Sequence, residues 1–301
     1  MSETPETPET PVAPEPPVIE IEQLSVAPAR RPDARLLNEI SLHAARLETV
    51  GIVGVSGCGK SVLASAILGL LRTPPLRVEG SIKLSGRELV GMREADLRAL
   101  RGSEASLIVS NARLRLNPLL PVGEQLVRAI RQKRPISKAD AAAEARGLMQ
   151  SVGIGDPERR MRALPSELSG GMCQRIVIAM GICNQPSLIV ADEPTSGLDV
   201  TIQTQVLTLI RGVIHRVSAA MILMTRDLGV VAHFCDRVIV MEHGRIVEEA
   251  PVRDFFRDPK HPHSRMLLDA AFASRGAAEV AAEAAAAVAA AATAATETGS
   301  A

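Results

Sequence analysis

Aromatic residues are almost missing from this chain, which contains no Trp, no Tyr and only four Phe. Its core must therefore be aliphatic, which is feasible because 46% of the residues are hydrophobic. Aromatic stacking platforms for single-stranded nucleic acid are excluded as a main feature. The 34 basic and 34 acidic residues give zero formal net charge, so no general attraction to nucleic acid or anionic lipid is expected.

Cysteine motifs and long apolar runs are also scarce. The four cysteines form no C-x-x-C pair, so neither a disulfide framework nor a zinc site is indicated, and a reducing compartment is the simplest interpretation. No apolar run reaches the roughly 18 residues of a membrane helix. The N-terminus lacks the basic and apolar segments of a secretory signal. Any membrane association is therefore expected to come through a partner.

Composition divides the chain into a central domain and two tails. Residues 1–17 repeat Glu, Thr and Pro, and such a segment cannot bury enough apolar surface to fold, so a disordered tail is expected. Residues 273–301 are dominated by Ala and are predicted to form a second tail, either frayed helix or disordered. The domain between them covers residues 18–272.

Strand-like and helix-like segments alternate within this domain, which predicts an α/β fold with a largely parallel sheet. Residues 61–71 have apolar side chains at helical spacing, and residues 237–247 predict a hairpin. Residues from about 96 to 165, rich in Ala, Arg and Leu, predict an inserted helical subdomain. The short apolar runs that predict strands are Val18–Leu24, Thr49–Val53, Leu188–Ala191 and Met221–Met224.

A glycine-rich segment between a predicted strand and a predicted helix fits the pattern G-x-x-x-x-G-K-S. Its glycines let the backbone curl so that N–H groups point at phosphate oxygens, and the helix adds its positive N-terminus. Lys60 is expected to contact the β- and γ-phosphates of ATP, and Ser61 to bind Mg²⁺. The expected nucleotide-binding residues here are Gly54, Ser56, Gly57, Cys58, Gly59, Lys60, Ser61 and Val62.

Cys58 within this loop has two interpretations. It is either a redox-sensitive thiol near a helix start or a small residue that fits a tight loop. The second interpretation is favoured.

Two carboxylates, Asp192 and Glu193, end a predicted strand. Ligands gather at the carboxyl ends of parallel strands. Asp192 is therefore expected to bind Mg²⁺, and Glu193 to orient or deprotonate an attacking water. A solvated acidic loop is the alternative, and it is disfavoured by Pro194, Gly197 and Asp199 directly after the pair.

A second anion site is predicted at Ser169, Gly170 and Gly171, where a serine and two glycines begin an apolar helix. Gln174 on the same helix is also expected to bind the nucleotide. One nucleotide does not need two such sites in one chain. A dimer resolves the difficulty if each nucleotide lies between the glycine loop of one subunit and the Ser-Gly-Gly segment of the other.

In this combination the motifs resemble the ATP-binding subunits of ABC transporters, and in particular the importers of oligopeptides, dipeptides and nickel. The resemblance covers about residues 18–270. The superfamily residues are Ser169-Gly170-Gly171 and Asp192-Glu193-Pro194-Thr195. The branch residues include Leu116-Asn117-Pro118, Gly197-Leu198-Asp199-Val200-Thr201 and His261-Pro262-His263-Ser264-Arg265.

This resemblance implies a P-loop NTPase core of the ABC type, with an antiparallel β subdomain and an inserted helical subdomain. It implies ATP and Mg²⁺ as cofactors and ATP hydrolysis coupled to import. The implied partners are transmembrane permease subunits, a second ABC ATPase subunit in a homodimer or heterodimer and, indirectly, an extracytoplasmic solute-binding protein. The implied location is the cytoplasmic face of the membrane.

Three positions depart from the family pattern. Ser110 replaces a glutamine that contacts Mg²⁺, and Arg226 replaces a histidine that senses the γ-phosphate, so both are candidate catalytic residues beside Glu193. Arg226 is long enough to reach the phosphate, whereas Ser110 would need a bridging water. The aromatic residue that stacks on adenine near residues 26–28 is missing, and Arg30 or Arg31 is the expected substitute.

Three functions therefore stay open. The chain is either a working transport ATPase with slower turnover, or a subunit that hydrolyses ATP poorly and completes the site of a different partner. The third possibility, an ABC-type ATPase that acts on nucleic acid or ribosomes, is disfavoured by the neutral charge. It is also disfavoured because the chain has neither a second nucleotide domain nor a long coiled-coil insertion.

Overall fold

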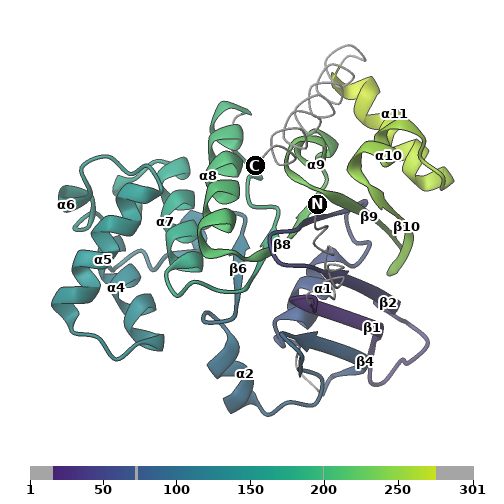
Figure 1. Ribbon diagram of the computed structural model, residues 1–301, viewed down its shortest axis with the longest axis horizontal. Coiled ribbons are helices and arrows are strands. Elements are labelled where there is room, and N and C mark those ends of the chain that lie inside the picture. Colours follow the sequence, from purple (N-terminus) through teal and green to yellow (C-terminus); the bar gives the residue numbers. More distant parts are fainter. Residues whose placement is uncertain (1–15, 72–73, 199, 276–301) are drawn as a thin grey trace, which may run out of the picture.

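The computed structural model describes residues 16–71, 74–198 and 200–275 (Figure 1). Its centre is a six-stranded sheet in the order β10-β9-β3-β8-β7-β6. The strands are β3 (Thr49–Val53), β6 (Ala105–Val109), β7 (Leu188–Asp192), β8 (Ala220–Thr225), β9 (Arg237–Glu242) and β10 (Arg245–Pro251). All neighbours pair in parallel except β9 and β10. The predicted α/β class with a mostly parallel sheet is therefore confirmed.

A smaller antiparallel sheet has the order β2-β1-β4-β5. Its strands are β1 (Ile19–Pro28), β2 (Leu37–Ala44), β4 (Leu76–Leu84) and β5 (Arg87–Glu88). The sheet shares one aliphatic core with α1 (Lys60–Ile67) and one face of the central sheet. Because α1 is packed from both sides in this way, the loop that precedes it is fixed relative to both sheets.

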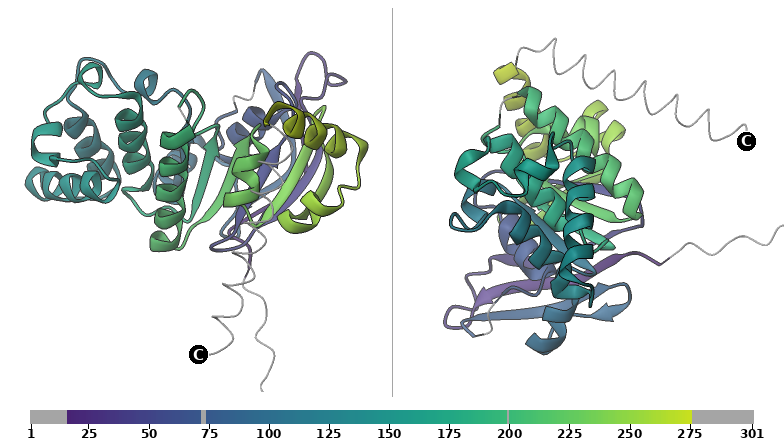
Figure 2. Two further views of the ribbon diagram at one scale, coloured as in Figure 1. Left: turned by 90° about the horizontal axis from the view of Figure 1, so that it is seen from above. Right: turned by 90° about the vertical axis from the view of Figure 1, so that its left-hand side faces the viewer.

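The other face of the central sheet is covered by a second aliphatic core that reaches into the helical region. Helices α4–α7 gather at one end of the molecule, away from the small sheet (Figures 1 and 2). The helices besides α1 are α2 (Glu94–Leu100), α3 (Ala112–Arg115), α4 (Val122–Lys133), α5 (Lys138–Ser151), α6 (Pro157–Arg160), α7 (Gly170–Ile182), α8 (Val200–Val217), α9 (Leu228–Phe234), α10 (Val252–Arg257) and α11 (Pro262–Arg275). Among the described residues, no helix combines the length and the hydrophobicity needed to cross a bilayer.

The expected helical segment 96–165 is interrupted by a strand. β6 lies within it and pairs in parallel with β7, so the helices beyond it begin only with α3. The run Ala105–Val109 is short and follows charged residues, and a strand buried in a parallel sheet has no polar alternation that would mark it.

Several boundaries also differ from the expected ones. α1 ends at Ile67 rather than near residue 71. The helix stops in a Schellman cap, in which Gly69 has φ 59° and the N–H of Leu70 donates to the carbonyl of Ser65 at 2.8 Å. β1 continues to Pro28 and pairs with β4 through its last residues. α11 runs to Arg275, past the expected start of the second tail. Residues 1–15 and 276–301 of the predicted tails lie outside the described residues.

Two turns of similar backbone conformation allow the close contact between Gly244 and Leu36 to be tested through its effect on the free energy of unfolding. Ser85-Gly86 and His243-Gly244 have nearly the same backbone, with φ 47° and 77° against 46° and 76°. A Cβ added at Gly244 would lie 2.5 Å from the carbonyl oxygen of Leu36, whereas one at Gly86 would meet nothing within 4 Å.

Gly86→Ala is therefore expected to lower the free energy of unfolding by about 1 kcal/mol, the cost of a left-handed alanine. Gly244→Ala is expected to lower it by at least about 1 kcal/mol more, because the strand end must move. Urea unfolding of both variants measures the difference. Equal losses would contradict the assigned contact.

Candidate functional site

The glycine loop runs from the end of β3 to the start of α1 and closes against the β9–β10 hairpin. Gly54 has φ 156°, and a Cβ there would collide with the carbonyl oxygen of Met241 and with the sulfur of Cys58. The N–H of Gly244 donates to the carbonyl of Cys58 at 2.9 Å, which fixes the loop from the other side. The sequence needs glycine at position 54 because any side chain would push the loop off the hairpin.

Lys60 is directed back into this loop rather than into solvent, and only 7% of its surface is exposed. Its Nζ donates to the carbonyl oxygens of Gly54 and Val55 at 2.6 and 3.2 Å, and to Sγ of Cys58 at 3.6 Å. An ammonium group is thereby held within the curled backbone, where a phosphate oxygen would be attracted to it.

Ser61 and Asp192 meet at the open side of the loop. Ser61 Oγ donates to Asp192 Oδ2 at 2.8 Å, although 131 residues separate them in the chain. Neighbouring oxygen ligands of an octahedral Mg²⁺, at 2.0–2.1 Å from the metal, lie about 3 Å apart. The spacing and chemistry of these two oxygens therefore fit a shared Mg²⁺, with phosphate oxygens and waters as the remaining ligands.

Glu193 and Arg226 lie side by side because β7 and β8 are adjacent parallel strands, and each residue directly follows the end of its strand. Arg226 Nε lies 2.9 Å from Glu193 Oε1, and Nη2 donates to Oε2 at 3.2 Å. Arg226 Nη1 also donates to Ser56 Oγ at 3.4 Å. One guanidinium thus joins the glycine loop to the carboxylate that follows Asp192.

Ser110 follows the end of β6, and its backbone N–H donates to the carbonyl of Asp192 at 3.2 Å. Its side chain lines the same cleft as Ser61, Asp192 and Arg226. The fold therefore brings the three candidate catalytic residues, Ser110, Glu193 and Arg226, to one edge of the sheet beside the glycine loop.

A cleft of about 560 Å³ contains this arrangement. Its lining includes Ser56, Gly57, Gly59, Lys60, Ser61 and Val62 from the expected nucleotide-binding set. Its lining also includes Arg35, Leu36, His243 and Gly244. Arg35, rather than Arg30 or Arg31, is the arginine of this region that lines the cleft.

The thiol in the loop is enclosed. Cys58 is 3% exposed and accepts a hydrogen bond from Lys60, which favours its interpretation as a small residue that fits the loop. The cysteines elsewhere are buried as well, and burial raises the pKa of Cys183 to about 11 and that of Cys235 further. None of these thiols is placed for nucleophilic chemistry.

The Ser-Gly-Gly segment forms a separate, exposed helix N-terminus. Ser169 is the N-cap of α7, and its Oγ accepts a hydrogen bond from the N–H of Met172 at 3.2 Å. A Cβ at Gly170 would meet nothing within 4 Å, so this end of the helix is open to an approaching group. None of Ser169, Gly170 and Gly171 lines the cleft beside Lys60, so one chain does not bring the two predicted anion sites together.

Gln174 differs from its predicted neighbours because it points inward. It is 3% exposed, and its side-chain amide donates to the carbonyl of Val109 at 3.3 Å. In the described structure Gln174 therefore connects α7 to the end of β6, directly before Ser110.

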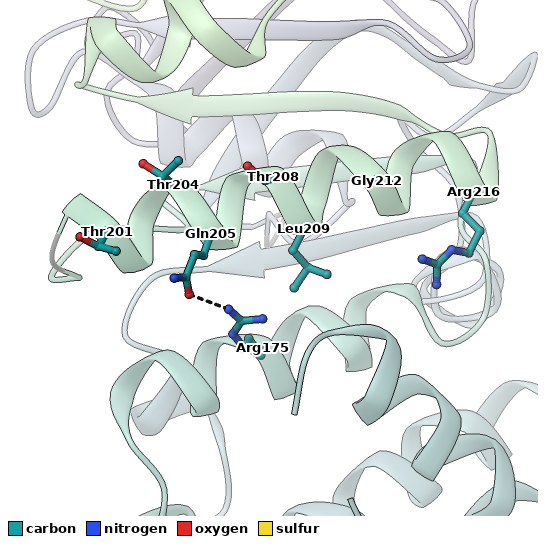
Figure 3. A pocket seen from close by; sticks show the side chains of 8 residues that line it. All are labelled: Arg175, Thr201, Thr204, Gln205, Thr208, Leu209, Gly212 and Arg216. Carbon is teal, nitrogen blue, oxygen red and sulfur yellow. Dashed lines mark hydrogen bonds between the residues drawn. The ribbon is translucent and has the colours of Figure 1, made fainter. Parts of the chain in front are cut away.

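A groove beside α8 shows how α7 is held in place (Figure 3). Arg175 donates to Gln205 Oε1 at 3.0 Å across this groove and to the carbonyl of Val152 at 2.7 Å. These two bonds connect α7 to α8 and to the end of α5, so the orientation of the Ser169 N-cap depends on a packed helical layer.

Comparison with known proteins agrees with this geometry. Residues 37–196, which include the glycine loop, Ser169 and Glu193, match the family model described as ABC transporter. The chain belongs to the ABC transporter family. A probable peptide ABC transporter ATP-binding protein of Sinorhizobium fredii is 44% identical over 237 residues, which cover 78% of this chain and 71% of that protein.

The oligopeptide transport ATP-binding protein OppD of Salmonella typhimurium is 42% identical over 238 residues, covering 79% of this chain and 71% of that protein. Among solved structures, the dimeric ATP-binding cassette MJ0796 bound to ADP and Pi superposes with TM-score 0.67 at 22% identity, covering 78% of this chain and 98% of that one. CbiO1 of Clostridium perfringens superposes with TM-score 0.70 at 20% identity, over 88% and 98% of the chains. These likenesses confirm the predicted ABC-type fold.

The contact between Ser61 and Asp192 yields a prediction for magnesium. Ser61→Ala is expected to reduce the gain in ATP affinity that Mg²⁺ produces by at least about tenfold, because it removes one of two converging oxygens. Ser65→Ala is the matched control, since Ser65 Oγ only donates to the carbonyl of Ser61 within α1. Titration of a fluorescent ATP analogue with and without Mg²⁺ measures both. Equal behaviour of the two variants would contradict the shared site.

Proposed function

We propose that this chain is the ATP-binding and ATP-hydrolysing subunit of an ABC importer for peptides or a related small solute. The observation that carries this proposal is the meeting of Lys60, Ser61, Asp192 and Glu193 around one cleft. Relatives that are 40–44% identical are ATP-binding proteins of oligopeptide and dipeptide transport, which supports the solute class.

In the proposed reaction, the N–H groups of the loop and Lys60 bind the β- and γ-phosphates, and Ser61 and Asp192 hold Mg²⁺. Glu193 orients a water molecule and accepts its proton as the water oxygen bonds to the γ-phosphorus. The bond between the γ-phosphorus and the bridging oxygen breaks, and ADP leaves with that electron pair. When bound, Mg²⁺ offsets negative charge on the phosphate oxygens.

The separation of the two anion sites supports a dimer. Ser169 and Gly170 at the N-terminus of α7 are exposed, and with Gly171 they are proposed to cover the nucleotide held by a second ABC ATPase subunit, identical or different. Permease subunits are the proposed membrane partners, with a solute-binding protein acting through them. This assembly would hold the chain at the cytoplasmic face of the membrane.

The pairing of Arg226 with Glu193 favours a second candidate, in which the chain binds ATP, turns it over slowly and completes the site of a different subunit. Both oxygens of the carboxylate are engaged by a permanent cation. The short side chain at Ser110 adds to this case, because it replaces a longer amide expected near Mg²⁺.

Hydrolysis by the pure protein separates the two candidates. If the chain is a working ATPase, Glu193→Gln should lower the turnover number by at least about a hundredfold, the low end of a general base's contribution. Glu124→Gln is the matched control, because Glu124 also pairs with an arginine, Arg128, but on α4. Turnover that is as slow in the native chain as in Glu193→Gln would favour the second candidate.

Binding provides an independent test of the site. Lys60→Ala is expected to weaken ATP binding by at least about a hundredfold, since a charged hydrogen-bond donor buried at the phosphates contributes about 3 kcal/mol. Lys138→Ala, at an exposed position on α5, is the control and should bind ATP like the native chain. Calorimetric titration with ATP measures the affinities. Unchanged affinity in Lys60→Ala would refute the proposed phosphate site.

A further inference from the structure

The guanidinium of Arg226 occupies the space between the glycine loop and Glu193. Two of its nitrogens engage the two oxygens of Glu193, at 2.9 and 3.2 Å, and a third donates to Ser56 Oγ at 3.4 Å. The carboxylate is therefore bound at both oxygens. A water in the cleft would have to compete with this guanidinium for Glu193.

The other cations that line the cleft are engaged elsewhere. Lys60 is held by the loop carbonyls, and Arg35 donates to Asn38 Oδ1 at 2.6 Å and pairs with Glu39. Arg226 is different because its partner is the carboxylate proposed to act on water. Its contact with Ser56 also places it beside the loop where the γ-phosphate is expected.

A phosphate and a carboxylate present the same fork of oxygens to an arginine, so each can replace the other as its partner. The side chains of Arg226 and Glu193 are 56% and 26% exposed, which makes their ion pair a weak one of about 1 kcal/mol or less. A nearby γ-phosphate with about two negative charges is able to displace such a partner. ADP has no γ-phosphate and offers Arg226 no comparable partner.

We propose that Arg226 exchanges partners, holding Glu193 when no γ-phosphate is present and moving to the γ-phosphate when ATP binds. The exchange frees Glu193 to accept a hydrogen bond from the attacking water. This inference rests on the proposed function, because it assigns the γ-phosphate to the space beside Ser56. It makes Arg226 a residue that distinguishes ATP from ADP and releases the base only for the nucleotide to be cleaved.

A double-mutant cycle tests the exchange. ATP and ADP affinities are measured for the native chain, Glu193→Gln, Arg226→Gln and the double variant, without Mg²⁺ and at concentrations where sedimentation shows a monomer. In the native background, Glu193→Gln should free Arg226 and raise ATP affinity by up to about fivefold. This is the change in affinity that corresponds to the free energy of the ion pair. ADP affinity should stay unchanged. In the Arg226→Gln background, the same substitution should have less than about a twofold effect on ATP.

The alternative explanation is simple repulsion between Glu193 and the γ-phosphate. Repulsion alone would make Glu193→Gln raise ATP affinity as much, or more, when Arg226 is absent, and that result would overturn the exchange. ADP affinity serves as the internal control for a folded phosphate site in every variant. If the native chain bound neither nucleotide, the proposed function would fail with it, whereas normal binding without coupling would refute only the exchange.

Discussion

The curl of backbone between β3 and α1 is the constraint on which the site depends. It requires a glycine at position 54, because the loop passes too close to Met241 for any side chain. It also turns its carbonyls onto Lys60, so that the cation is in place before a ligand arrives. The two sheets pack against α1 and hold it in place. The N–H groups that follow β3 are therefore already positioned before a ligand binds.

The position of the candidate catalytic residues follows from strand order. β6, β7 and β8 are neighbours that run in parallel, so their carboxyl ends deliver Ser110, Glu193 and Arg226 to the same side of the sheet. The register pairs Asp192 with Met224, and the N–H of Glu193 donates to the carbonyl of Met224 at 2.9 Å. Glu193 has φ 49°, and its side chain pairs with Arg226.

Local patterns predicted the parts of the site whose geometry is local. The glycine loop, its flanking strand and helix, and the N-cap at Ser169 each need only a few consecutive residues. The pairing of Glu193 with Arg226 spans 33 residues and depends on two strands lying side by side, so the sequence could indicate both residues but not their contact. Arg35, rather than Arg30 or Arg31, lines the cleft. The loop between β1 and β2 has no periodicity from which the sequence could predict which arginine would do so. The strand β6 was missed because it carries no polar alternation. The burial of Gln174 was missed because its partner, the carbonyl of Val109, lies 65 residues away in the chain.

Within one chain, a set of hydrogen bonds connects α7, which carries the predicted second anion site, to α1, which follows the glycine loop. Gln174 on α7 donates to the end of β6 at Val109, and the next residue, Ser110, donates through its backbone to Asp192. Asp192 in turn accepts from Ser61, in the first turn of α1. The Ser169 N-cap lies on the same helix as Gln174. If a partner subunit displaced α7, these hydrogen bonds would be stretched. The carboxylate of Asp192, which is proposed to hold Mg²⁺, would then shift. Contacts of this kind supply a physical route for coupling between α7 and Asp192.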